Sequence, residues 1–71
     1  MAVAKIIEVV GNSTKGWDDA VRNAVSEAAE TVKGISGVEV CDMTAKVQKD
    51  KITEYRATVK IAFRVEETRK R

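Results

Sequence analysis

The side chains best placed for chemistry stand on one side of a C-terminal segment, residues 52–65. Polar and apolar residues alternate along it with period two, which is typical of a half-buried β-strand. The polar side carries both signs of charge, on Glu54, Arg56, Lys60 and Arg64. Two interpretations stay open. The row is either a solvated face with cross-strand ion pairs, each of which contributes little, or the lining of a ligand slot between subunits.

Carboxylates in the same part of the chain could serve a metal ion. Oxygen ligands suit Ca²⁺ or Mg²⁺, and the carboxylates that symmetry could bring together in an oligomer are Glu39, Asp42, Glu54 and Glu66. The sequence has no histidine, which argues against ligation of zinc or haem. Calcium or magnesium is therefore the ion class that these side chains suit, and the ligand set remains unknown.

Catalysis has little support in the residue types present. The commonest general base, histidine, is absent. Cys41 is the only cysteine and has no recognisable partner that would activate it as a nucleophile. Its place in an alternating segment predicts a small buried apolar residue instead. We expect no catalytic residues and no enzymatic activity.

The elements that must position these residues follow from the apolar pattern. Residues 4–10 and 38–48 are rich in β-branched residues and predict two further strands, and the polar turn 49–51 predicts a hairpin joining 38–48 to 52–65. A helix of about 17 residues is expected between the first two strands, because apolar residues recur there at spacings of three and four. Its stripe comprises Trp17, Ala20, Val21, Ala24, Val25, Ala28, Thr31 and Val32.

The ends of this helix carry recognisable signals. Ser13 is the predicted N-cap, with Thr14 as the alternative, and Gly34 fits the left-handed residue that closes a helix. Trp17 lies on the apolar stripe, so we interpret it as a core or interface anchor in preference to a ring that stacks on a ligand.

The order β-α-β-β predicts an α+β fold. A right-handed crossover would put the last strand in the centre of a three-stranded antiparallel sheet, packed on one helix. On strand 38–48, Val38, Val40 and Asp42 would point to one side, and Cys41, Met43 and Val47 to the other. The predicted core consists of Ile7, Val9, Val21, Val25, Ala28, Val32, Val59, Ile61 and Phe63.

The chain is too short to cover its own sheet. We expect a single domain over residues 1–71, with residues 68–71 as a disordered tail. Fourteen strand residues span roughly 45 Å, whereas the predicted helix spans only about 26 Å. A domain of this size is marginal alone and cannot form an internal disulfide with one cysteine. The remaining solution is self-association.

Charge and composition restrict the other partners. A net charge of +2 is too small to indicate nucleic-acid binding. No apolar stretch approaches the ~20 residues that cross a bilayer, so no membrane partner is expected. One free cysteine without a signal peptide predicts a cytoplasmic location.

Several stretches together resemble one family, the dodecins. They are Val-Val-Gly-Asn-Ser at 9–13, Ala-Glu-Thr-Val at 29–32, Val-Glu-Val at 38–40, and the run from Glu54 to Glu67. Dodecins are small β-α-β-β proteins that assemble twelve copies into a hollow shell and hold flavins in pairs at two-fold axes. The resemblance implies a homododecamer and a small-ligand site that includes Gly37, Val38, Arg56 and Arg64.

The sequence departs from the flavin-binding pattern at two of these positions. Where flavin-binding dodecins have a stacking tryptophan, this chain has Gly37, which offers no π surface. Where they have a glutamine, it has Arg56, which donates hydrogen bonds but cannot accept them. Arg64 matches an arginine that binds flavin phosphate or coenzyme A in some members. The Ser-x-x-x-Trp pattern from Ser13 to Trp17 is similar to the helix start in the branch of the family that lacks flavin. Calcium binding has been associated with that branch.

These observations predict a dodecameric small-ligand binding or storage protein with weak or lost flavin binding. An ion or an anionic cofactor would bind at subunit interfaces. One alternative is a purely structural or protein-interaction oligomer without a cofactor. The other is a genuine flavin-sequestering dodecin.

Overall fold

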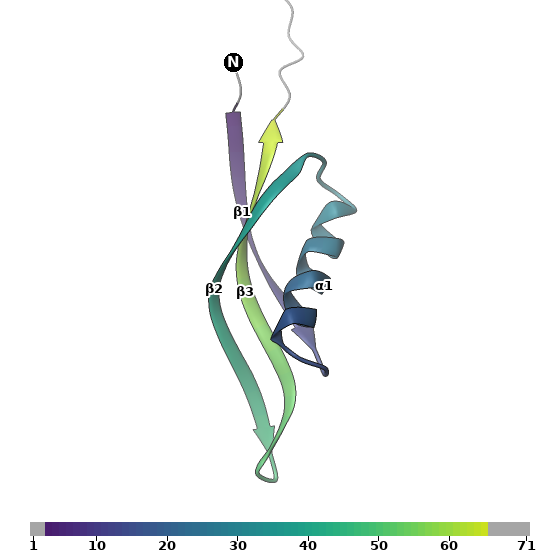
Figure 1. Cartoon of the computed structure of the whole chain (residues 1–71), viewed down its shortest axis with the longest axis vertical. Coiled ribbons are helices and arrows are strands. Elements are labelled where there is room, and N and C mark those ends of the chain that lie inside the picture. Colours follow the sequence, from purple (N-terminus) through teal and green to yellow (C-terminus); the bar gives the residue numbers. More distant parts are fainter. Residues whose placement is uncertain (1–2, 66–71) are drawn as a thin grey trace, which may run out of the picture.

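One helix and three strands make up the part of the chain that the computed structural model describes, residues 3–65. They follow in the order β1 (Val3–Ser13), α1 (Trp17–Ala29), β2 (Ile35–Gln48) and β3 (Lys51–Val65) (Figure 1). The sheet has the order β1-β3-β2, and both neighbouring pairs are antiparallel. The predicted α+β architecture with a central last strand is confirmed. The predicted tail, residues 68–71, lies outside the described residues.

Two strands are longer than their apolar patterns indicated. β1 continues three residues past Val10, because Gly11 to Ser13 still pair with β3. β2 begins at Ile35, three residues before the predicted start at Val38. Strand pairing rather than side-chain pattern therefore decides where these strands end.

The start of α1 differs from the prediction. The N-cap is Gly16, which provides no side-chain hydrogen bond, so capping by Ser13 or Thr14 is wrong. Ser13 is instead the last residue of β1, and its Oγ accepts a hydrogen bond from the backbone N–H of Lys15 at 2.8 Å. The same hydroxyl donates to Oδ2 of Asp19 at 2.7 Å. Ser13 thus ties the turn between β1 and α1 to the first turn of the helix.

The end of α1 also comes early. The helix has 13 residues and ends at Ala29. Gly34 has the expected positive φ, 78°, but it comes after the turn that follows the helix and does not close the helix. Its carbonyl accepts the backbone N–H of Arg64 at 2.9 Å. Gly34 therefore bends the chain onto β3.

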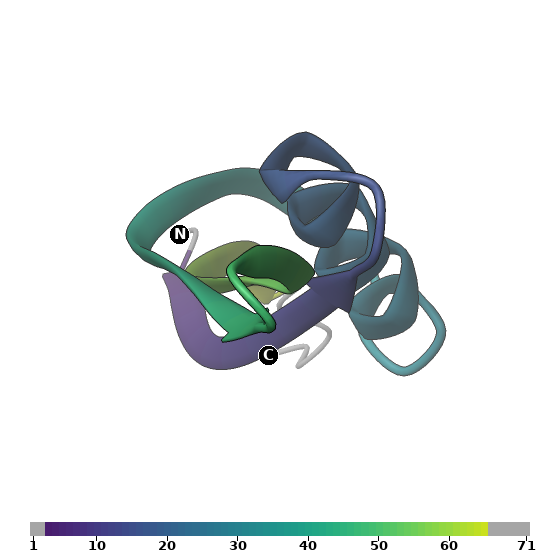
Figure 2. The ribbon, with the colours of Figure 1, turned by 90° about the horizontal axis from the view of Figure 1, so that it is seen from below.

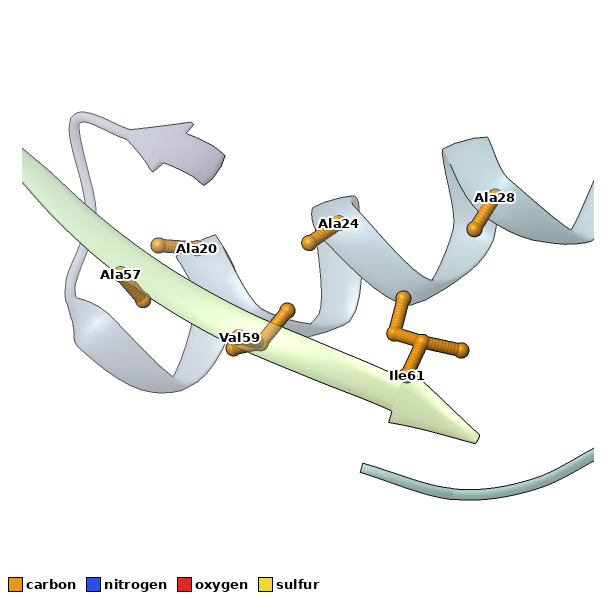
Figure 3. Close-up of a cluster of buried hydrophobic side chains, with 6 residues drawn as sticks. All are labelled: Ala20, Ala24, Ala28, Ala57, Val59 and Ile61. Atoms are coloured by element: carbon orange, nitrogen blue, oxygen red, sulfur yellow. The ribbon is translucent and has the colours of Figure 1, made fainter. Parts of the chain in front are cut away.

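The core is a thin layer of small side chains between α1 and the sheet. Ala20, Ala24 and Ala28 of the helix face Ala57, Val59 and Ile61 of β3 (Figure 3). Three predicted core residues, Ala28, Val59 and Ile61, are buried, and Phe63 is half-buried outside this cluster. The other predicted core residues pack around it partly buried: Ile7, Val9, Val21, Val25 and Val32. The three alanines are the buried residues of α1, because their small side chains let the helix approach the sheet closely.

Strand β2 contains a bulge that the predicted faces missed. Val40 pairs with Val59 and Asp42 with Thr58, so Cys41 is the extra residue. Beyond it the strand reverses its faces, and Met43 lies opposite Ala57, on the same face as Val40. The predicted separation of Val40 from Met43 is therefore wrong. Cys41 is exposed, not buried as predicted.

The hairpin of β2 and β3 projects beyond the helix (Figure 1). The end view in Figure 2 shows the sheet curling along its length with α1 on one side. The radius of gyration is 15.1 Å, against roughly 11 Å for a compact domain of this length. Within residues 3–65, no helix combines the length and apolar character needed to span a membrane. Large apolar side chains left exposed on the hairpin include Val40 and Met43 beside α1, and Val47 and Ile52 on the projecting part.

Candidate ligand-binding site

The four predicted ligand residues do not gather at one place within the chain. Gly37 pairs with Ala62 on the outer face, by which we mean the face of the sheet turned away from α1. Arg56 lies six positions away on the same face of β3, roughly 20 Å at ~3.3 Å per residue. Val38 pairs with the buried Ile61 and therefore belongs to the opposite, helix face. A ligand that touches both Gly37 and Arg56 would have to lie between two copies of the chain.

The surroundings of Gly37 are open. A Cβ built on this residue would meet no heavy atom within 4 Å in the described chain. Arg64 lies near this end of the outer face, where it pairs with Ala4 and is exposed. The space that a larger side chain at position 37 would need is therefore free in the single chain.

Arg56 lines a cleft on the outer face of the hairpin. Thr44, Ala45 and Lys46 of β2 form its other wall, and the cleft has a volume of about 280 Å³. Thr44 is the direct cross-strand partner of Arg56, and Lys46 is the partner of Glu54. Sequence reasoning missed Thr44 and Lys46 as site residues. The register of the hairpin could have identified them, because it places Lys46 diagonally across from Arg56.

One carboxylate stands beside the two cations of this cleft. Oε1 of Glu54 lies 3.7 Å from a terminal guanidinium nitrogen of Arg56. A charge-assisted hydrogen bond would be roughly 1 Å shorter, so the pair is an ion pair without a hydrogen bond. The Arg56 side chain is 49% exposed. Its donors remain largely available to a ligand.

Trp17 supports this cleft from the helix face. Its Nε1–H donates to the carbonyl oxygen of Thr44 at 2.9 Å. Its ring meets Tyr55 edge to face, with ring centroids 4.8 Å apart. Because Thr44 and Tyr55 belong to different strands, one side chain of α1 holds both walls of the hairpin. The prediction of an anchoring Trp17 agrees with these contacts.

The charged row farther along β3 behaves differently. Lys60 stands in register between Glu8 of β1 and Glu39 of β2, and all three side chains are exposed. Opposite charges in this arrangement are typical of a solvated face. Within residues 3–65 no group of three or more potential metal ligands comes together. Glu66, one of the predicted carboxylates, lies outside the described residues.

Two apolar grooves flank α1. One lies between α1 and β1, has a volume of about 370 Å³ and is lined in part by Ile7, Val9 and Ala24. The other lies between α1 and β2, has a volume of about 410 Å³ and includes Val40 and Met43. Both grooves are mostly apolar and open, which is typical of surfaces covered by another chain.

Known proteins are similar to this chain in sequence and fold. The Dodecin family model matches residues 3–66. A dodecin of Thermus thermophilus is 30% identical over 66 residues, covering 93% of this chain and 96% of the relative. The solved dodecin of Streptomyces coelicolor is 33% identical, with a TM-score of 0.89 over 94% of this chain and 96% of its own.

A relative named for a metal ion is also similar. The calcium dodecin of Mycobacterium tuberculosis is 28% identical over 65 residues, which cover 92% of each chain. Its crystal structure, described as having a novel calcium-binding site, superposes with a TM-score of 0.78 over 97% of this chain and 99% of its own. The family match spans nearly the whole chain and agrees with the β-α-β-β fold, and this chain therefore belongs to the dodecin family.

Proposed function

We propose that this protein forms a dodecameric hollow shell that binds and stores a small ligand without turning it over. The observation that carries the proposal is the uncovered apolar surface of the hairpin. Met43 is 56% exposed, Val47 60% and Ile52 46% in the single chain. Exposed apolar surface of this kind is a liability for a monomer and is removed by self-association. The two apolar grooves beside α1 offer places where neighbouring copies could dock.

The ligand of the shell is proposed to differ from the flavin of the type members. Gly37 supplies no ring to stack on an isoalloxazine, and Arg56 cannot accept a hydrogen bond from its polar edge. Gly37 and Arg56 lie on the same face but far apart, so any shared ligand sits between copies. Weak or lost flavin binding follows from the chemistry of these two residues.

Calcium is the second candidate ligand. The similarity of this chain to the calcium dodecin of Mycobacterium tuberculosis favours it. Glu39, Asp42 and Glu54 lie on β2 and β3 without assembling a site within one chain. Symmetry-related copies would have to complete the six to eight oxygen ligands that calcium takes. The ion would then be held at subunit interfaces.

Native mass spectrometry of the protein as purified tests the proposal. We expect a particle of twelve chains, and any mass above twelve chains identifies what the shell carries. Thermal denaturation with added calcium, and with magnesium as control, then tests the ion, because a ligand that binds only the folded state raises the melting temperature. A stable monomer would contradict the shell. Twelve bare chains with no response to either ion or to flavin would favour a purely structural oligomer.

A further inference from the structure

We propose that the outer-face cleft of the hairpin, formed by Thr44, Lys46 and Arg56, binds a small phosphate-bearing anion. The inference deepens the proposed storage function by naming a ligand class. The cleft itself is made by residues of a single chain.

Charge is the first argument for an anion. Two cations, Lys46 and Arg56, line the cleft, and one carboxylate, Glu54, stands beside them. The only ion pair among residues 3–65 is the 3.7 Å contact between Glu54 and Arg56. Neither the guanidinium of Arg56 nor the ammonium of Lys46 donates a hydrogen bond to another described residue. Apart from the ion pair with Glu54, the donors of this cleft therefore have no hydrogen-bond partner among the described residues.

The geometry of these donors favours phosphate over carboxylate. Arginine presents a planar fork that binds two oxygens of a phosphate or a carboxylate, whereas lysine acts as a point charge. Arg56 and Lys46 approach from different strands on a diagonal. A tetrahedral phosphate can offer oxygens to both cations and a third to the hydroxyl of Thr44. A planar carboxylate held by the fork turns both of its oxygens to Arg56, so it would have to share one of them with Lys46.

The size of the cleft limits the ligand. A volume of about 280 Å³ lies just below the ~300–1,000 Å³ of typical small-molecule pockets. It equals roughly nine water molecules at ~30 Å³ each. Phosphate or pyrophosphate fits this space. The cleft is therefore large enough for a compact anion, or for the phosphate end of a larger molecule.

The cleft is held in shape before any ligand arrives. The indole N–H of Trp17 donates a hydrogen bond of 2.9 Å to the carbonyl oxygen of Thr44. The same ring packs on Tyr55, the neighbour of Arg56 in β3. On the other side, the hydroxyl of Thr53 donates to the carbonyl oxygen of Lys46 at 3.3 Å. Because these contacts already hold the walls of the cleft, less conformational entropy is lost when a ligand binds. Trp17 also gives a spectroscopic probe, because it is the only tryptophan.

Isothermal titration of the full-length protein with pyrophosphate at low ionic strength tests this site. We expect saturable binding that changes the fluorescence of Trp17. The variants Arg56→Gln and Lys46→Gln should each weaken binding about tenfold or more, because each removes a charge-assisted contact. Lys51→Gln is the matched control, since it removes the same charge from the same hairpin outside the cleft, and it should leave binding unchanged.

Three outcomes would overturn the inference. They are absence of binding to the unmodified protein, an equal loss in Lys51→Gln, and equal affinity for citrate, which would mean unspecific attraction of anions. A failure of the phosphate site can be distinguished from a failure of the proposed shell. A twelve-chain particle that ignores pyrophosphate overturns the phosphate site alone. A monomer that binds pyrophosphate overturns the shell and supports the site, because one chain makes the cleft.

Discussion

At the scale of single residues, Gly11 decides how closely the helix approaches the sheet. A Cβ at this position would collide with the carbonyl oxygen of Ala20 and lie 2.9 Å from Cβ of Ala24. The Gly11→Ala variant should therefore lose about 1–3 kcal/mol of stability through overpacking. Gly37→Ala is the control, because its Cβ meets open space, and it should gain up to about 1 kcal/mol from reduced freedom of the unfolded chain. Equal melting temperatures for the two variants would contradict this packing.

At the scale of elements, the sequence predicts the order and the antiparallel pairing but misses the irregularities. Alternation in residues 52–65 is uninterrupted by Pro or Gly, so β3 was predicted to within one residue. In β2 the apolar side switches between Val40 and Met43, and that switch was a readable sign of the bulge at Cys41. Two further shifts occur, one between Ile35 and Gly37 and one after Lys46, where Val47 pairs with Ile52. The shifts at Cys41 and after Lys46 flank the cleft, which explains why Lys46 was not predicted as a site residue.

The turn of the same hairpin offers a test at this scale. Lys49 and Asp50 both have positive φ, 52° and 64°, the arrangement of a type I′ turn. A left-handed conformation costs a residue with a Cβ roughly 1–2 kcal/mol, and glycine avoids most of this cost. Asp50→Gly should stabilise the protein by about 0.5 kcal/mol or more, measured by chemical denaturation. Asp50→Ala should destabilise it, because alanine tolerates positive φ less well than aspartate. The reverse ranking would contradict the turn.

At the scale of the whole molecule, the length of β3 was the most informative feature of the sequence. Fifteen strand residues extend roughly 50 Å, whereas the 13 residues of α1 cover about 20 Å. The helix is shorter than expected, so the need for a covering partner is greater than the sequence indicated. A site that forms between copies is harder to predict. Pairing within one chain fixes Gly37 opposite Ala62 and Arg56 opposite Thr44, and only an assembly can join them.

The double variant Gly37→Trp with Arg56→Gln tests whether positions 37 and 56 meet between copies of the chain. It restores a stacking surface and an amide that both donates and accepts, so the assembled protein should quench the fluorescence of added riboflavin. Gly37 has the space for the ring. Because the two positions lie roughly 20 Å apart along β3, dissociated chains should not quench, and each single variant should bind more weakly than the double variant. The same change removes Arg56, so pyrophosphate binding should fall as flavin binding appears. An intact shell of the double variant that leaves riboflavin fluorescence unchanged would show that positions 37 and 56 do not meet between copies.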